Sequence, residues 1–181
     1  MTKIIDIANY QPRSTDVFFF DNNIWMYLFC PIAGYQKHKQ QKYSDFFSKI
    51  NIAKACIWIN SLVLSEFCNA WLKIEYENWR RKPENVMKSK YKLDFIPSDT
   101  YKKSVSQIKL TLTQILNNTE RCSDEFNSID LENVYKELDN CDFNDSYYLE
   151  LARTKNWKIV TDDADFFNYS NNVEVITANI K

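Results

Sequence analysis

The chain of 181 residues contains a single glycine, Gly34, and this scarcity constrains the fold more than any other feature. Glycine makes up roughly 7% of an average protein. The phosphate-binding loops GxGxxG and Walker A, and the nucleophile elbow GxSxG, each need more than one glycine. The sequence therefore excludes classical dinucleotide binding, P-loop hydrolysis and nucleophile-elbow esterases.

The side chains available for catalysis are mostly carboxylates. His38 is the only histidine, so HExxH zinc sites and other multi-histidine sites are excluded. The chain has 24 acidic and 23 basic residues, and this net charge of −1 favours neither a polyanion binder nor a disordered acidic chain. A hydrophobic content of 45% is that of a folded domain. A hydrolytic site in this chain should therefore be built from Asp and Glu.

The cysteines and the N-terminal segment indicate the compartment. The five cysteines have no CxxC spacing and are odd in number, which favours reduced thiols. The N-terminal segment carries Asp6 and Asp16 and lacks the apolar run of a signal peptide. The longest apolar stretch, residues 24–29, is too short to span a membrane. We therefore expect a cytoplasmic protein without a membrane partner.

Short apolar runs separated by helical patterns indicate the fold class. The runs predict buried strands at residues 17–20, 56–59, 157–161 and 173–177. Helical periodicity or capping signals predict helices at residues 24–29, 43–53, 62–81, 99–116, 130–138 and 144–156. Strands that alternate with helices are typical of an α/β fold with a parallel sheet covered on both faces. No linker or repeat divides the chain, so we expect a single domain over residues 1–181.

Four acidic residues occupy positions where α/β proteins place their active sites. Asp21 follows the first predicted strand and Asp163 follows the strand at 157–161. Glu66 lies one turn into the helix after the second strand, and Asp145 lies in the first turn of the helix at 144–156. Ligands of open α/β sheets bind beyond the carboxyl ends of the strands. We therefore expect these four side chains to converge at one sheet edge.

Convergence of four carboxylates has an electrostatic cost. Two carboxylates 4 Å apart repel by roughly 1 kcal/mol in water and roughly 4 kcal/mol at an effective dielectric constant of 20. Such a cluster needs raised pKa values or a bound divalent cation. Oxygen ligands favour Mg²⁺ or Mn²⁺ over Zn²⁺. A hard cation of this kind lowers the pKa of bound water and neutralises phosphate charge, which is the chemistry of phosphodiester hydrolysis.

Four segments in this order resemble the PIN-domain nucleases. They are VFFFDNN at 17–23, INSLVLSEF at 59–67, DSYYLELA at 145–152 and KIVTDDADF at 158–166. The final VEVIT at 173–177 resembles the closing strand of that family. The resemblance implies a three-layer α/β/α sandwich with a parallel sheet of four to five short strands. It also implies a Mg²⁺- or Mn²⁺-dependent ribonuclease that cleaves RNA to leave a 5′-phosphate and a 3′-hydroxyl.

The resemblance assigns roles residue by residue. The acidic positions of the family correspond to the catalytic and metal-binding candidates Asp21, Glu66, Asp145 and Asp163, and its supporting Asn and Thr correspond to Asn23 and Thr161. Asp142 is either the N-cap of the helix that carries Asp145 or a further carboxylate on the same face. Asn22 departs from the family, which has a small hydroxyl residue there, and the middle of the chain is longer than in compact PIN toxins.

The charge distribution adds a candidate surface for RNA. Residues 73–92 hold seven basic and three acidic residues, whereas residues 120–165 hold thirteen acidic and five basic ones. We interpret residues 73–98 as a basic helical arm beside the acidic site, with RNA-binding candidates Arg80, Arg81, Lys82 and Lys88. A solvated helix end is the alternative interpretation, because charge runs usually face water.

Several biological roles are compatible with these residues. Many small PIN proteins are toxins, so we expect an antitoxin protein as a partner besides RNA, and a second copy of the chain as a further candidate. A PIN nuclease of RNA processing or decay and a catalytically silent RNA- or protein-binding module are alternatives. A phosphoryl-transfer protein with an Asp nucleophile would need a Lys after a late strand. Lys155 and Lys158 lie at the wrong end of that strand for this role.

Overall fold

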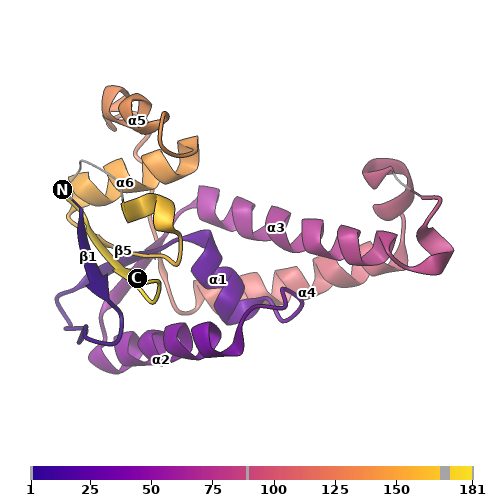
Figure 1. Cartoon of the computed structure of the whole chain (residues 1–181), viewed down its shortest axis with the longest axis horizontal. Helices are drawn as coiled ribbons and strands as arrows, with labels where there is room; N and C mark the ends of the chain where they lie inside the picture. The colour runs from indigo at the N-terminus through magenta and orange to yellow at the C-terminus, as the bar shows by residue number, and fades with distance from the viewer. Residues whose placement is uncertain (1, 89, 168–171, 181) are drawn as a thin grey trace.

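A computed structural model describes residues 2–88, 90–167 and 172–180, which form a parallel sheet with helices on both faces (Figure 1). The strands are β1 Lys3–Asp6, β2 Val17–Phe20, β3 Cys56–Ile59, β4 Glu120–Arg121, β5 Lys158–Val160 and β6 Glu174–Thr177. They form one six-stranded sheet in the order β1-β6-β5-β2-β3-β4, with parallel pairing throughout. The α/β class with a parallel sheet is therefore confirmed.

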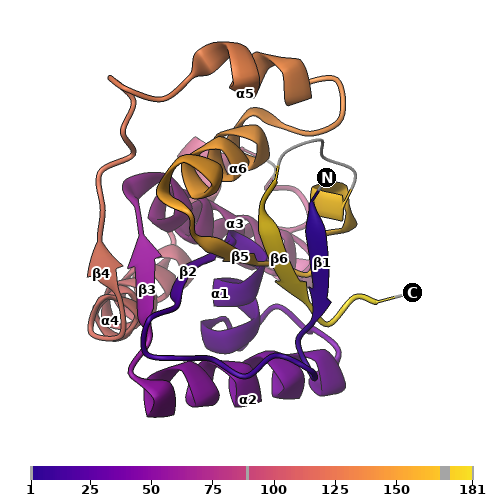
Figure 2. The same ribbon diagram turned by 90° about the vertical axis from the view of Figure 1, so that its left-hand side faces the viewer.

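The helices cover the sheet from two sides. The α-helices are α1 Asn22–Phe29, α2 Lys37–Ala53, α3 Ser61–Arg80, α4 Asp99–Leu116, α5 Leu131–Glu137 and α6 Phe143–Lys155. Single helical turns are η1 Pro83–Asn85, η2 Tyr91–Phe95 and η3 Ala164–Phe167. Figure 2 shows α2 on one side of the sheet and α6 on the other, which is the three-layer arrangement.

The apolar run of β2 forms the centre of the core. Its side chains alternate between the two faces of the sheet, as a pleated strand requires. Phe18 packs against Phe46 of α2 with ring centroids 5.8 Å apart, whereas Phe19 packs against Tyr148 of α6 at 5.1 Å. Because β2 is buried on both faces, its sequence reads as a continuous apolar run.

The order of the strands reverses between β2 and β5. From β2 the sheet continues through β3 to β4, whereas β5 and β6 lie on the other side of β2. Phe20 and Val160 are paired at the ends of these two strands, and the Asp21 N–H donates to the Val160 carbonyl at 3.1 Å. The crevice at such a reversal is where open α/β sheets bind ligands. Asp21 and Thr161 both lie at this edge.

The sheet has six strands where four to five were expected. The additional strands β1 and β4 lie at the two edges. The sequence of β1 is KIID, in which two of four residues are charged, and β4 consists only of Glu120 and Arg121. An edge strand has one neighbour and one open side, so it tolerates polar residues and lacks the apolar run of a central strand. This is why the pattern of the sequence did not indicate them.

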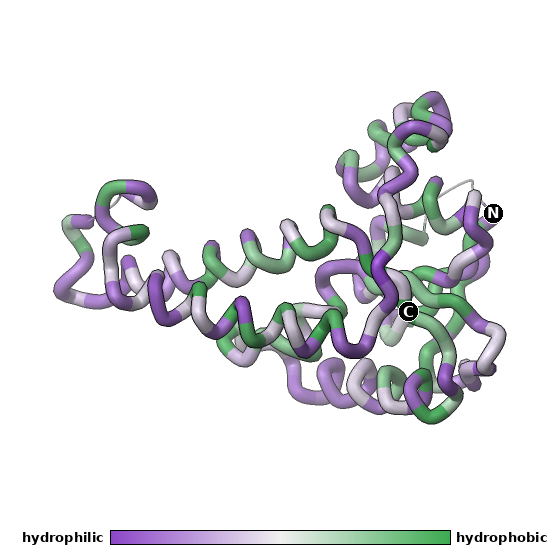
Figure 3. The backbone as a smooth tube through the Cα atoms, turned by 180° about the vertical axis from the view of Figure 1, so that it is seen from behind, coloured by the Kyte–Doolittle hydropathy of each residue, from purple (hydrophilic) through white to green (hydrophobic). Residues whose placement is uncertain are grey.

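The helices α3 and α4 project from the sheet as a long helical hairpin (Figure 1). The 20 residues of α3 correspond to a length of about 30 Å. At the tip, Tyr76, Trp79 and Tyr91 pack around the buried Phe95. The segment 73–98 is therefore the outer part of this hairpin, and it has its own aromatic core. Figure 3 shows hydrophobic and hydrophilic positions alternating along both helices of the hairpin.

None of the helices in the described part of the chain combines the length and the apolar character that crossing a lipid bilayer requires.

Candidate active site

Asp21 is placed by the end of β2 and the start of α1. It is the N-cap of α1 with extended backbone angles, and its Oδ1 accepts a hydrogen bond from the Asn22 N–H at 2.5 Å. Its side chain is buried, with 7% of the residue exposed to solvent. A strand that ends in an Asp N-cap thus places one carboxylate at the reversal of strand order.

Asn23 and Thr161 hold the Asp21 carboxylate from two elements. The Thr161 hydroxyl donates to Asp21 Oδ2 at 2.8 Å, and the Asn23 amide donates to the same oxygen. The Asn23 amide also donates to Thr161 Oγ1 at 2.9 Å. Both side chains thus lie beside the Asp21 carboxylate.

The structure distinguishes the adjacent carboxylates Asp162 and Asp163. Asp162 faces the helices α1 and α2, where Lys39 Nζ lies 2.7 Å from its Oδ2 and the hydroxyls of Tyr27 and Tyr43 donate to it at 2.8 and 2.9 Å. The charge of Asp163 instead raises the pKa values of both Asp21 and Asp145, and its Oδ1 accepts a hydrogen bond from the Asp165 N–H at 2.9 Å. Asp163 therefore belongs to the acidic cluster, whereas Asp162 belongs to a structural ion pair.

Asp145 enters the cluster from the first turn of α6. Asp142 is the N-cap of this helix, because its Oδ1 accepts a hydrogen bond from the Asp145 N–H at 3.0 Å. This contact decides between the two interpretations of Asp142 in favour of the cap. The charge of Asp142 nevertheless raises the pKa of Asp145. The position near the N-terminus of the helix favours a negative charge on Asp145.

Glu66 reaches the site from α3 and is held by two side chains of α6. The Asn144 amide donates to Glu66 Oε1 at 2.5 Å, and the Tyr148 hydroxyl donates to Oε2 at 2.7 Å. The sequence analysis missed both donors. Their spacing of four residues places them on one face of α6, next to Asp145, and this spacing was the available signal.

The pKa values of the carboxylates show that the four side chains form one cluster. Burial raises the pKa of Asp21 to about 7, and the charges of Glu66 and Asp163 contribute. Burial also raises the pKa of Asp145 to about 8, with contributions from Asp21, Asp163 and Glu66. The pKa of Glu66 is raised by burial, although its two donors act in the opposite direction. The four predicted residues thus lie close enough for their charges to interact.

The donor chemistry of this cluster fits a hard divalent cation, but the side chains are not arranged as a finished ligand shell. Among the described residues, no group of three or more His, Cys, Asp or Glu side chains is positioned to hold a metal ion directly. The carboxylates of Asp21 and Glu66 are instead turned to protein donors. An ionised carboxylate has several lone-pair sites, so an oxygen that accepts one of these hydrogen bonds can also bind an ion. Mg²⁺ and Mn²⁺ are the ions that carboxylate oxygens favour.

The predicted RNA-binding residues lie on the outer part of the hairpin. Arg80 forms an ion pair with Glu77 at 2.9 Å and lies over the ring of Tyr76. Lys88 donates to Asn85 at 3.1 Å and lies 5.9 Å from the ring centroid of Trp79. Arg81 and Lys82 are exposed at the end of α3. Two of the four candidates are therefore partly committed to contacts within the hairpin.

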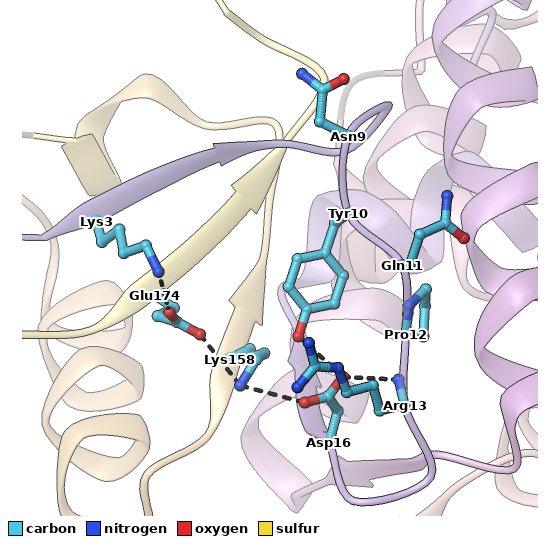
Figure 4. A pocket seen from close by; sticks show the side chains of 9 residues that line it. All are labelled: Lys3, Asn9, Tyr10, Gln11, Pro12, Arg13, Asp16, Lys158 and Glu174. Carbon is cyan, nitrogen blue, oxygen red and sulfur yellow. Dashed lines mark hydrogen bonds and ion pairs between the residues drawn. The ribbon is translucent and has the colours of Figure 1, made fainter.

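A second polar pocket lies at the opposite edge of the sheet, where the strands begin (Figure 4). There Lys158 lies 3.4 Å from Asp16 and 3.1 Å from Glu174, and Glu174 also pairs with Lys3 at 2.7 Å. The Tyr10 hydroxyl donates to the buried Asp16 at 2.9 Å. These carboxylates are matched by partners on neighbouring elements. We interpret the network as a structural clamp rather than a ligand site.

Comparison with known proteins supports the fold. No protein-family model matches the chain, and no curated protein is similar to it in sequence. Among solved structures, the chain is similar to one in the crystal structure of VapBC2 from Rickettsia felis bound to a DNA fragment from their promoter. The TM-score is 0.51 at 16% sequence identity, over 88% of this chain and 98% of that chain. The chain therefore shares its fold with a component of VapBC2.

Proposed function

We propose that this protein is a metal-dependent endoribonuclease of the PIN type. The observation that carries the proposal is the convergence of Asp21, Glu66, Asp145 and Asp163, from four separate elements, at the reversal of strand order. Burial raises the pKa of Asp145 to about 8, and the neighbouring charges of Asp21, Asp163 and Glu66 contribute to this rise. A divalent cation would counteract this shift, since it favours the ionised form of each carboxylate.

In this proposal the four carboxylates hold Mg²⁺ or Mn²⁺, and Asn23 and Thr161 orient Asp21. The ion supplies a lowered pKa for the attacking water and neutralises charge on the phosphate. Asn144 and Tyr148 fix the carboxylate of Glu66 through its two oxygens. The products of such a hydrolysis are a 5′-phosphate and a 3′-hydroxyl.

We further propose that the protein is the toxin of a toxin–antitoxin pair. The fold that it shares with a VapBC2 chain supports this role. The antitoxin would then be a protein partner encoded beside it. Expression in a bacterial host should arrest growth, and Asp145→Asn should relieve the arrest. Growth arrest that persists in this variant would contradict a nuclease toxin.

The enzymatic proposal is tested with purified protein and 5′-labelled single-stranded RNA in Mg²⁺, Mn²⁺ or EDTA. We expect cleavage in the presence of either ion and none in EDTA. Asp145→Asn and Asp163→Asn should abolish cleavage. Asp165→Asn is the matched control, because Asp165 lies two residues after Asp163 and is exposed. Binding of RNA without cleavage under all metal conditions would favour the silent RNA-binding module instead.

A further inference from the structure

A groove runs along α3 from the start of α1 toward the end of the hairpin. It lies between α1, the segment 30–35 and α3, and has a volume of about 550 Å³. Asn23 lines the groove at the end near the site, and the same amide donates to Asp21 and Thr161. A molecule in this groove would therefore lie next to Asn23, one hydrogen bond away from the Asp21 carboxylate.

The far end of the groove is basic. Lys73, Glu77 and Arg81 line it from successive turns of α3, and Lys73 and Arg81 are separated by about 12 Å along the helix. Glu77 is paired with Arg80 at 2.9 Å, so its charge is compensated. Within the described part of the chain, Lys73 and Arg81 have no carboxylate partner within ion-pair distance. Two uncompensated cations thus face the groove at a spacing that suits an extended polyanion.

The middle of the groove combines apolar walls with one polar atom that lacks a partner. Ile32, Ala33 and Ile74 contribute apolar surface. Asn22 also lines the groove, and its Oδ1 is buried with no hydrogen-bond partner among the described residues. A buried acceptor without a partner has lost its hydrogen bond to water, so a donor from a ligand is favoured there. The χ2 torsion of an Asn side chain is broad, so rotation about it can present this oxygen to a ligand in the groove.

We propose that this groove is a nucleotide subsite that binds the RNA residue next to the cleaved phosphate. Asn22 Oδ1 accepts a hydrogen bond from an exocyclic amino group of the base or from the 2′-hydroxyl, the apolar walls contact the base, and Lys73 and Arg81 neutralise the neighbouring phosphates. The inference rests on the proposed nuclease function, which it extends from the reaction to the substrate path. An apolar protein segment would contact the walls of the groove, but it would not neutralise the charges of Lys73 and Arg81.

The test measures binding and therefore does not depend on cleavage. Fluorescein-labelled 12-nucleotide single-stranded RNA is titrated with the full chain in EDTA at several salt concentrations. Each phosphate that is neutralised on a single strand contributes about 0.7 to the slope of log K against log salt. Lys73→Gln with Arg81→Gln should lower the slope by about 1.4, whereas Lys109→Gln, an exposed lysine on α4, should leave it unchanged. An unchanged slope in the double variant overturns the subsite.

The role of Asn22 is tested with Asn22→Leu, which removes the acceptor at similar volume. RNA affinity should fall about 3- to 10-fold, while the thermal stability of the free protein stays the same or rises. If the donor is the 2′-hydroxyl, the loss occurs with RNA and not with DNA of the same sequence. If the donor is a base amino group, the loss occurs with oligo(A) and oligo(C) but not with oligo(U). Wild-type affinity of Asn22→Leu for all of these oligonucleotides overturns the role of Asn22.

The outcomes separate the two proposals. Metal-dependent cleavage together with unchanged binding in the groove variants refutes the subsite and leaves the nuclease proposal standing. Altered RNA binding in these variants without any cleavage by the wild type supports a nucleotide-binding groove and refutes the nuclease.

Discussion

The hydroxyl of Thr161 donates a hydrogen bond to Asp21 Oδ2 at 2.8 Å, which joins two residues 140 positions apart in the sequence. The contact exists because β2 and β5 are neighbours in the sheet and end at the same level. It places two of the predicted site residues, Asp21 and Thr161, on adjacent strand ends. The helices α3 and α6 approach the same edge of the sheet and bring Glu66 and Asp145 toward this pair.

The two neighbouring carboxylates of the TDDADF segment should respond in opposite ways to substitution. Asp162→Asn removes the charge that pairs with Lys39 and should lower the free energy of unfolding by about 1–3 kcal/mol. Asp163→Asn removes a repulsive charge and should leave stability unchanged or raise it, while cleavage is lost. Urea denaturation and an RNA cleavage assay of both variants check this. A stable Asp162→Asn protein without cleavage would place Asp162 in the site.

The metal-free protein should lose stability as the pH rises from about 5 to 7. The pKa of Asp21 is about 7 in the folded chain, against roughly 3.9 for an unfolded Asp, so the folded state binds more protons in this range. One such carboxyl changes the free energy of unfolding by up to about 1.4 kcal/mol per pH unit. Asp145 acts in the same direction.

This pH dependence has a direct control. Asp16 and Glu174 have lowered pKa values, so their stabilising effect is lost only at more acidic pH. Asp21→Asn should flatten the curve of unfolding free energy between pH 5 and 7 in EDTA. A curve identical to that of the wild type would mean that Asp21 is ionised throughout this range.

The Tyr148 hydroxyl should matter for catalysis through Glu66. Tyr148→Phe removes one of the two donors to the Glu66 carboxylate but retains the ring that packs on Phe19. Loss of a hydrogen bond that orients a metal ligand typically costs 10- to 100-fold in activity or metal affinity. We expect a loss of about 10-fold in the cleavage rate and a weaker response to Mn²⁺.

Tyr147→Phe is the matched control for this variant. The Tyr147 hydroxyl donates to the Asp124 carbonyl at 2.7 Å, away from the carboxylates. Its removal should reduce stability without reducing the cleavage rate per folded molecule. Equal rates for Tyr148→Phe and Tyr147→Phe would remove Tyr148 from the proposed site.

The clamp at the opposite edge of the sheet should contribute to stability alone. Lys158→Met breaks the ion pairs to Asp16 and Glu174, of which Asp16 is buried. We expect the free energy of unfolding to fall by about 1–3 kcal/mol. The cleavage rate of the folded fraction should not change, because Lys158 lies at the start of β5 and the acidic cluster lies beyond its end. Reduced cleavage by fully folded Lys158→Met would give this edge a role in the reaction.

Local sequence patterns were sufficient for the fold class. The apolar runs that became β2, β3, β5 and β6 are buried, and burial on both faces of a parallel sheet demands a continuous apolar sequence. The edge strands β1 and β4 have no such demand, so only backbone pairing reveals them. The apolar runs of β2 and β5 also made it possible to predict from the sequence that Asp21 and Asp163 follow these strands. Their catalytic roles stay predictions.

Tertiary structure alone decided which way the side chains of the site face. The segment TDDADF contains three carboxylates with no periodic pattern, and only the packing of α2 against β5 shows that Lys39 draws Asp162 away from the cluster. The partners of Glu66 depend on how α6 approaches α3, two helices distant in sequence. The groove beside Asn22 likewise exists only between elements. Periodicity reports which face of one element is buried, whereas hydrogen bonds across elements depend on the distances that the assembled fold imposes.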